Sequence, residues 1–413
     1  MTPQQLRKLR RELDEFADYL TDDMGRPERR RAMEQYLLGL LLDGERKSIE
    51  PMAARLVDDP SEVEGMRQRL QQCVTVSPWA EDEMFRRVAL KVDSELPGVE
   101  AMVFDDTGFA KKGQYSVGVA RQYSGTLGRR DNCQVAVSLH LAGEAGSGCI
   151  GMRLYLPRSW TDDRARCAAA GVPDDVELLP RWQIALSLLD KALAWGVRRH
   201  PALADSGYGD VTEFREGLRE RGLQYVVGIS STLVMWPPGT TFTVPKKKSS
   251  TGPKPTVPRG DREPISVKEL APTLSYRKIT WREGTRGPQS SRFAAVRVRT
   301  AHRHKQGYPP GEEEWLLCEW PEGEPAPTKY YLSSLPRTAS LKHLVRLAKL
   351  RWRIERDYQE MKGEVGLDHF EGRMWRGFHH HAALCAAAHA FLALQRALSP
   401  PEEDLLDTAA GAA

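Results

Sequence analysis

The 413-residue sequence has no uninterrupted apolar run of about 18 residues, the length that a membrane-spanning helix needs. Its first eight residues, Met-Thr-Pro-Gln-Gln-Leu-Arg-Lys, also lack the apolar core of a signal peptide. These two absences predict a protein that has no membrane partner and stays in the cytoplasm.

The sequence also lacks any Cys-x-x-Cys pair, which argues against a zinc ribbon and against a disulfide framework. We expect its six cysteines to be reduced and mostly buried. A strong net charge is missing as well, since the sum is only +4. The 60 Lys and Arg residues can still form local positive grooves, so the composition permits a DNA partner without requiring one. The cysteines are Cys73, Cys133, Cys149, Cys167, Cys318 and Cys385.

Changes in hydrophobic pattern divide the chain into four segments, and its length suits two or three domains. Residues 1–95 repeat apolar side chains every three or four positions, which predicts a small helical domain with basic clusters that either contact phosphates or form solvated faces. Residues 96–230 alternate apolar strands with helices, residues 231–335 are β-rich, and residues 336–413 are helical again. The fold class is therefore α/β.

Two aspartates stand where apolar strand patterns end. The run at 100–106 ends in Asp105 and Asp106, and Asp205 follows the short run at 202–204. Active sites of α/β sheets assemble at such strand ends. The apolar runs that follow the first strand are separated by Gly-rich turns, so we expect them to pair with it in antiparallel fashion.

A third acidic candidate lies on a charged helix at 350–362. Arg351, Glu355, Tyr358 and Lys362 stand at i, i+4, i+7 and i+11, so one face of an uninterrupted helix would carry all four. A solvated helix with internal ion pairs is the simpler explanation of the charges. The two aspartates elsewhere in the chain favour a single metal site with Glu355 instead.

Two further stretches contain notable basic or imidazole groups. Residues 245–262 are rich in Pro, Lys and Ser and are expected to be mobile. His379, His380 and His381 are adjacent, so their side chains would point about 100° apart on a helix and are poorly placed to bind one metal ion. Packing or phosphate contact is the better explanation for them.

The motifs Asp105-Asp106-Thr107-Gly108-Phe109, Asp205-Ser206-Gly207 and Arg351 to Lys362 together resemble the DDE-superfamily transposases of bacterial insertion sequences. The resemblance is closest to the cut-and-paste enzymes whose signature spaces Tyr, Arg, Glu and Lys as Arg351, Glu355 and Lys362 are spaced here. Ala348 stands where the signature has tyrosine. The three motifs occur in the order that the family requires.

The resemblance implies an RNase H-like catalytic core with a β-rich insertion and an N-terminal helical DNA-binding domain. Asp106, Asp205 and Glu355 would be the catalytic acids and would bind two Mg²⁺ ions, with Mn²⁺ as a substitute. Asp105 is the rival of Asp106, because adjacent strand residues face opposite ways. Glu360 is the rival of Glu355, about 140° round the helix.

The resemblance also implies a set of partners. The enzyme would act on double-stranded DNA, both element ends and target, as a homodimer on paired ends near the bacterial nucleoid. Five side chains would contact the DNA: Arg351, Lys362, Trp352, Lys111 and Lys112.

Three alternatives remain open. An RNase H-like nuclease would use the same carboxylates without joining strands, and a non-catalytic descendant would bind DNA only. A glycosidase also uses paired carboxylates, but the basic neighbours Arg351 and Lys362 argue against it.

Overall fold

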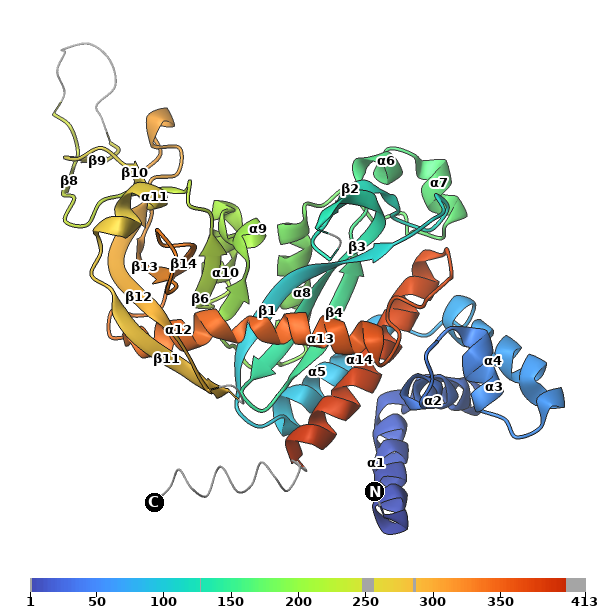
Figure 1. Cartoon of the computed structure of the whole chain (residues 1–413). Coiled ribbons are helices and arrows are strands. Elements are labelled where there is room, and N and C mark those ends of the chain that lie inside the picture. The colour runs from blue at the N-terminus through green and yellow to red at the C-terminus, as the bar shows by residue number, and fades with distance from the viewer. Residues whose placement is uncertain (1, 127, 247–255, 285–286, 399–413) are drawn as a thin grey trace. The chain divides into compact units, whose positions relative to one another are not determined.

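The computed structural model describes residues 2–126, 128–246, 256–284 and 287–398. It divides into two compact units. Figure 1 draws the whole chain, coloured by residue number. The first unit comprises Met1–Arg199 and Trp352–Ala413, and the second comprises His200–Arg351. Part of the basic stretch for which mobility is predicted, residues 247–255, lies outside the described residues.

The first unit begins with five helices whose ends follow local sequence signals. Thr2 caps α1: its hydroxyl accepts from the backbone N–H of Gln5, and the side-chain oxygen of Gln5 accepts from the backbone N–H of Thr2. Proline occupies the first turn of both α1 and α2, where its missing N–H costs nothing. The bounds are α1 Pro3–Thr21, α2 Pro27–Leu41, α3 Ile49–Arg55, α4 Val63–Thr75 and α5 Glu81–Glu95, with a 3-10 turn at Pro60–Glu62 before α4.

Four antiparallel strands form the sheet of the first unit. The long strand β3 pairs with β1 along one edge, and with β2 and then β4 along the other. This pairing confirms the antiparallel arrangement that the Gly-separated apolar runs predict. The bounds are β1 Val99–Ala110, β2 Ala120–Ser124, β3 Arg129–Gly143 and β4 Ser147–Leu154.

Helices cover both faces of this sheet. On one face, α5 and α8 pack so closely that a Cβ added at Gly148 would lie 3.2 Å from Val92, and one at Gly151 would lie 3.3 Å from Leu188. On the other face lie α13 and α14, where the ring centres of Phe109 and Phe378 are 5.4 Å apart. The bounds of the remaining helices are α6 Arg158–Thr161, α7 Arg164–Ala169, α8 Arg181–Ala194, α13 Trp352–Gly363 and α14 Trp375–Leu398.

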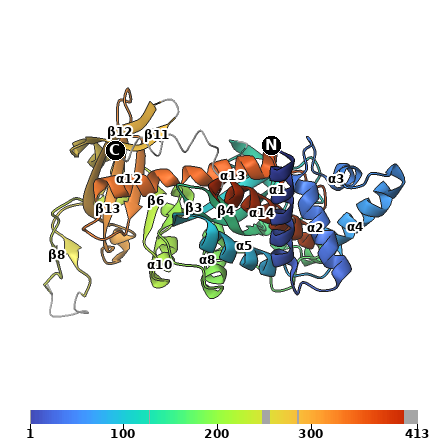
Figure 2. The same ribbon diagram turned by 90° about the horizontal axis from the view of Figure 1, so that it is seen from below.

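The Ala-rich helix α14 is the centre of the first unit. It is buried along most of its length and contacts α2, α4 and α5 as well as β4 (Figures 1 and 2). Phe16 of α1 meets Phe391 at 5.4 Å, and Tyr36 of α2 bonds to His381. Residues 1–95, expected as a domain of their own, thus share a core with the C-terminal helix.

The second unit is built mainly from strands, in the order β10-β7-β12-β13-β14-β6-β5, with β11 beside β12. The pair β5–β6 is parallel, and the other pairs are antiparallel. The helix bounds are α9 Ser206–Gly209, α10 Thr212–Glu220, α11 Val267–Leu270 and α12 Leu341–Leu350, with 3-10 turns at Ala271–Thr273 and His304–Gln306. The strand bounds are β5 Ala202–Ala204, β6 Tyr225–Ile229, β7 Val234–Trp236, β8 Phe242–Thr243, β9 Arg259–Gly260, β10 Ile265–Ser266, β11 Arg277–Gly284, β12 Gly287–Thr300, β13 Glu313–Trp320 and β14 Lys329–Ser333.

The secondary structure confirms the α/β class and the β-rich character of residues 231–335. The prediction of an uninterrupted helix through Arg351 is wrong, because α12 ends at Leu350 and α13 begins at Trp352. Arg351 keeps right-handed dihedral angles of −53° and −25°, and no Gly or Pro marks the interruption in the sequence. Among the described residues, no helix is long and apolar enough to cross a membrane.

Candidate active site

The two adjacent aspartates of β1 lie on opposite faces of the sheet. In the register of β1 with β3, Asp105 stands opposite Ser138 and Asp106 stands opposite Val137. Directly opposed residues of an antiparallel pair share a face. Ser138 bonds to α13, so Asp105 lies on the face of α13 and Asp106 on the face of α8.

Asp106 has a cationic partner on its own face. Nη1 of Arg181, the first residue of α8, donates to Oδ2 of Asp106 at 2.9 Å. The side chains are 30% and 18% exposed, so the pair is reachable from solvent. A metal ion binds the ionised carboxylate, and Arg181 would have to yield part of this ion pair to it.

Asp105 is half-buried and lies among residues that bind α13. Its Oδ1 accepts from the backbone N–H of Asp106 at 2.8 Å, which orients the carboxylate along the strand. Ser138, directly opposite, bonds to the hydroxyl of Tyr358 at 2.6 Å. The geometry of the first unit therefore makes Asp105 the aspartate that shares a face with the helix carrying Glu355.

The three acids of α13 have different surroundings. Glu355 is exposed, whereas Asp357 and Glu360 are buried. The helix turns about 100° per residue, so Asp357 is directed far from Glu355 and into the unit. Glu355 is thus the acid of this helix that solvent, and any ligand, can reach.

Asp357 belongs to a buried network beneath the helix. Its carboxylate contacts Nδ1 of His140 at 2.6 Å and accepts from the Ser147 hydroxyl at 2.5 Å. Burial opposes protonation of His140, but Cys149 and the Asp357 carboxylate outweigh it and raise the pKa of His140 to about 10. Burial also disfavours the ionised form of Asp357. The hydrogen bond from His140 stabilises that form and keeps the pKa of this carboxyl below the ordinary value.

Glu360, the rival of Glu355, is held in a second network. Its carboxylate contacts Nε2 of His389 at 3.2 Å, Nε of Arg356 at 2.6 Å and Nη1 of Arg396 at 2.7 Å. The hydrogen bonds from His389 and Arg356, together with the positive charge of Arg396, outweigh burial and lower the pKa of Glu360 to about 2. Its oxygens already accept from three side chains, which leaves Glu355 as the better metal-ligand candidate.

Asp205 ends the parallel strand β5 of the second unit and starts α9. Its Oδ1 accepts from the backbone N–H of Gly207 at 2.9 Å, so the carboxylate is an N-cap. A Cβ at Gly209 would lie 1.9 Å from the carbonyl oxygen of Gly228, so this turn packs against β6 with room only for glycine. The turn therefore holds the half-buried carboxylate of Asp205 at the end of its strand.

Two of the lysines expected to contact DNA have protein partners. Nζ of Lys362 donates to the carbonyl of Gly108 at 2.8 Å and lies 5.1 Å from the ring centre of Phe109. Nζ of Lys111 donates to the carbonyl of Phe370 at 2.9 Å. Burial lowers the pKa of both. Lys362 has a second, longer contact to the hydroxyl of Thr126 at 3.4 Å. Each ammonium has three donors, so at least one remains for another acceptor. Lys112 is exposed.

The other two DNA-contact candidates stand at the helix interruption. Arg351 and Trp352 are both half-buried. The guanidinium of Arg353 lies 4.6 Å from the ring centre of Trp352 and occupies one side of the indole. Since α13 begins after Arg351, the expected four-residue face reduces to Glu355, Tyr358 and Lys362 on one helix.

The three adjacent histidines are buried in α14. Nδ1 of His379 bonds to the carbonyl of Trp375, and its Nε2 accepts from the backbone N–H of Leu154. Nε2 of His381 bonds to the carbonyl of Gly366. Burial lowers the pKa of His379, His380 and His381 to about 4. Their positions agree with packing and give phosphate no access.

Within the described part of either unit, no three His, Cys, Asp or Glu side chains gather closely enough to hold a metal ion. Oxygen donors suitable for Mg²⁺ are nevertheless present in both. Asp105, Asp106 and Glu355 belong to the first unit, and Asp205 belongs to the second.

The sequence analysis missed the side chains that bind Asp106 and Asp357. Arg181 lies 75 positions from Asp106, and His140 lies 217 positions from Asp357. No local pattern links residues at such separations. Both become visible only through the sheet register and the helices packed on it.

Two comparisons with known proteins agree with each other. Residues 16–288 match the family described as DDE superfamily endonuclease. The "Probable transposase for insertion sequence element IS701" of Microchaete diplosiphon is 33% identical over 197 residues, which are 47% of this chain and 47% of that protein. The matched part thus spans about half the length of this relative. The family match includes Asp106 and Asp205 and ends before α13.

Proposed function

Because the chain belongs to the DDE superfamily endonuclease family, we propose that it is an insertion-sequence transposase that cleaves DNA with divalent metal ions and joins the released ends to target DNA. The partial relative described as a probable IS701 transposase supports this. Antiparallel strands β1 to β4 in one unit and the parallel pair β5–β6 in the other are the strand types of an RNase H-like core.

One observation carries the proposal. Of the three acids on α13, the signature position Glu355 alone is exposed, while Asp357 and Glu360 are buried in ion networks. Exposed carboxylates are common on surface helices, but here the exposed acid is the one at the signature position. The separation suits an acid that binds a ligand.

Asp106, Asp205 and Glu355 would hold two Mg²⁺ ions, or Mn²⁺ in their place. Carboxylate oxygens on separate parts of the chain suit these hard cations. Bound ions stabilise negative charge on the attacking and leaving oxygens of an in-line displacement at phosphorus. Arg181, on the face of Asp106, would keep that carboxylate oriented before the cation arrives.

The position of Asp105 on the face of α13 favours a second assignment of the first acid. In that alternative Asp105 binds the metal ion, and Asp106 with Arg181 forms a structural ion pair. Substituting the two aspartates separately distinguishes the assignments, as described in the Discussion.

DNA binding would be divided between two parts of the chain. Lys112, Arg351 and Trp352 would contact the strand being cut, and Lys111 and Lys362 would add their remaining donors. Carboxylates and metal ions contact only phosphate, which all sequences share, so end recognition needs another element. We assign it to the helices of residues 1–95, acting in a homodimer on paired ends at the bacterial nucleoid.

A strand-joining assay tests the proposal. The full chain is incubated with Mg²⁺ or Mn²⁺, a labelled duplex containing the terminal repeats that flank the gene, and a plasmid target. We expect metal-dependent cleavage at the repeat end and transfer of the label to the plasmid. Cleavage without transfer would favour the nuclease alternative, and binding without cleavage would favour a non-catalytic descendant.

A further inference from the structure

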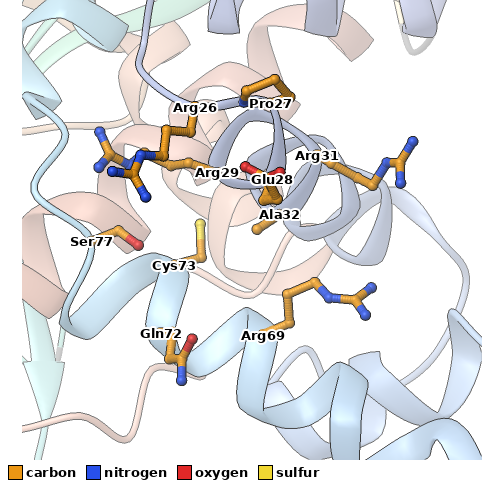
Figure 3. A pocket seen from close by; sticks show the side chains of 10 residues that line it. All are labelled: Arg26, Pro27, Glu28, Arg29, Arg31, Ala32, Arg69, Gln72, Cys73 and Ser77. Carbon is orange, nitrogen blue, oxygen red and sulfur yellow. The ribbon is translucent and has the colours of Figure 1, made fainter.

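A cavity of about 780 Å³ lies between the start of α2 and the second half of α4 (Figure 3). Four arginines line it: Arg26, Arg29 and Arg31 from the α2 segment, and Arg69 from α4. Figure 3 shows Arg26 and Arg29 together on one side, with Arg31 and Arg69 on the other. One carboxylate, that of Glu28, lies among them.

These four arginines differ from other arginines of the same helices. Within the described residues, none of the four has a carboxylate oxygen within 4 Å, whereas the neighbouring Arg30 pairs with Asp22 at 3.5 Å. Arg69 donates to the side-chain oxygen of Gln35 at 3.2 Å, which leaves its charge uncompensated. The cavity therefore concentrates positive charge that internal ion pairs do not neutralise.

The start of α2 adds to this charge. Arg26 is the N-cap residue but makes no side-chain capping bond, and Pro27 follows it. The first amide groups of a helix carry partial positive charge, which favours an anion. The helix end and the four arginines point to the same kind of ligand.

We infer that this cavity holds a segment of the sugar-phosphate backbone of double-stranded DNA. The inference rests on the proposed function and assigns a binding site to it. The volume is within the range of pockets for whole ligands and greatly exceeds one phosphate group. Arginines on two sides suit phosphates spaced along a strand, whereas the compact charge of a polyphosphate would crowd against Glu28.

The site positions DNA rather than reading its sequence. Guanidinium groups form bidentate hydrogen bonds with phosphate, and phosphates are the same in every sequence. Loss of the arginines should therefore weaken binding to all duplexes alike and reduce the dependence of binding on salt.

The test compares two triple variants of the full chain. Arg26→Gln, Arg31→Gln and Arg69→Gln remove three exposed cations of the cavity. The control, Arg129→Gln, Arg303→Gln and Arg337→Gln, removes three exposed cations outside residues 1–95, each of which pairs with a carboxylate, that of Asp131, Glu213 or Glu313. Both variants lose the same charge, and their thermal unfolding verifies that they fold.

Fluorescence anisotropy with a labelled duplex measures the affinity across a series of salt concentrations. We expect the cavity variant to bind at least about tenfold more weakly, with a log–log salt slope smaller by roughly 2 to 3. The control variant should stay close to the wild type. Equal behaviour of the two variants would overturn the inference.

Two further experiments distinguish a failure of this inference from a failure of the proposed function. If Glu355→Gln abolishes cleavage while the cavity variant binds DNA as the control does, only the inference fails. Absence of metal-dependent cleavage by the wild type would instead remove the proposed function. Inorganic phosphate that stabilises the wild type but not the cavity variant, with DNA affinity unchanged, would make the cavity a small-anion site and overturn the DNA assignment.

Discussion

The charged side chains of helix α13 and those at the start of α2 have opposite surroundings. On α13, Asp357 and Glu360 are buried and bound to His140, His389 and two arginines. At α2, several arginines line a cavity without a carboxylate partner among the described residues within 4 Å. Paired charges fix the position of a helix, whereas uncompensated charges are available to a ligand.

Glu355 stands between these two cases, because it is an exposed acid on a helix that buried acids hold in place. We infer that the buried acids Asp357 and Glu360 hold α13 in place and thereby fix the position of the exposed Glu355.

The largest effect is expected from removing the proposed metal ligands. Glu355→Gln and Asp205→Asn keep the size of the side chain, and Asn can still cap α9. Because several kcal/mol of charge stabilisation would be lost, we expect cleavage to fall by about 10³-fold or more. A gel assay with labelled DNA measures the rate, with the exposed neighbour Gln359→Ala as a control that retains activity. Cleavage at the wild-type rate by Asp205→Asn would refute the assignment.

The aspartates of β1 should differ by a similar factor. Asp106→Asn is expected to lose cleavage as Glu355→Gln does, while Asp105→Asn retains most of it. The same assay measures both variants with thermal unfolding as the check of fold. The reverse result would assign the metal ion to Asp105, on the face of α13, and would leave the Asp106–Arg181 pair a structural role.

The buried side of α13 should matter for stability. Asp357→Asn leaves protonated His140 without its counter-charge in the core, which costs about 3–5 kcal/mol. Urea unfolding measures the loss. Glu364→Gln is the matched control, since its ion pair with Arg396 is about half exposed and contributes no more than about 1 kcal/mol. A loss equal to that of the control would show that the network does not hold the helix.

Stability should fall between about pH 6.5 and 4.5 because of the buried histidines. The folded-state pKa of His379 and His381 is lowered to about 4, below the ordinary 6.5. The unfolded chain therefore binds protons that the folded protein does not, and each such histidine contributes a slope of about 1.4 kcal/mol per pH unit. His140 adds almost no slope below about pH 5.5, because there it is protonated in both the folded and the unfolded state.

Urea unfolding across this pH range measures the slope. His379→Gln should reduce it by about 1.4 kcal/mol per pH unit. The exposed His343→Gln should leave it unchanged. A wild-type stability that does not vary with pH in this range would contradict the burial argument.

The smallest effect concerns single lysines near the acidic residues. Lys112→Ala and Lys362→Ala should each lower the log–log salt slope of DNA binding by about 0.9. Lys362→Ala should also lower the thermal unfolding temperature, because its bond to the Gly108 carbonyl is lost. An unchanged slope together with a lower unfolding temperature would give Lys362 a structural role only.

The sequence alone predicted a good part of this molecule. Apolar runs separated by glycines gave the antiparallel strands β1 to β4, and periodic apolar residues gave the N-terminal helices, because both signals are local. The acids at strand ends and the signature around Glu355 could likewise be recognised within short segments of the sequence. The family match agrees with the transposase resemblance.

Only the tertiary structure determined which charged side chains are paired in the interior and which are exposed to solvent. It placed Asp105 and Asp106 on opposite faces, paired Asp106 with Arg181, and buried Asp357 against His140. It also interrupted the helix at Arg351 and joined residues 1–95 to α14. These outcomes depend on strand register and on contacts between residues far apart in the chain, and local periodicity contains no information about either.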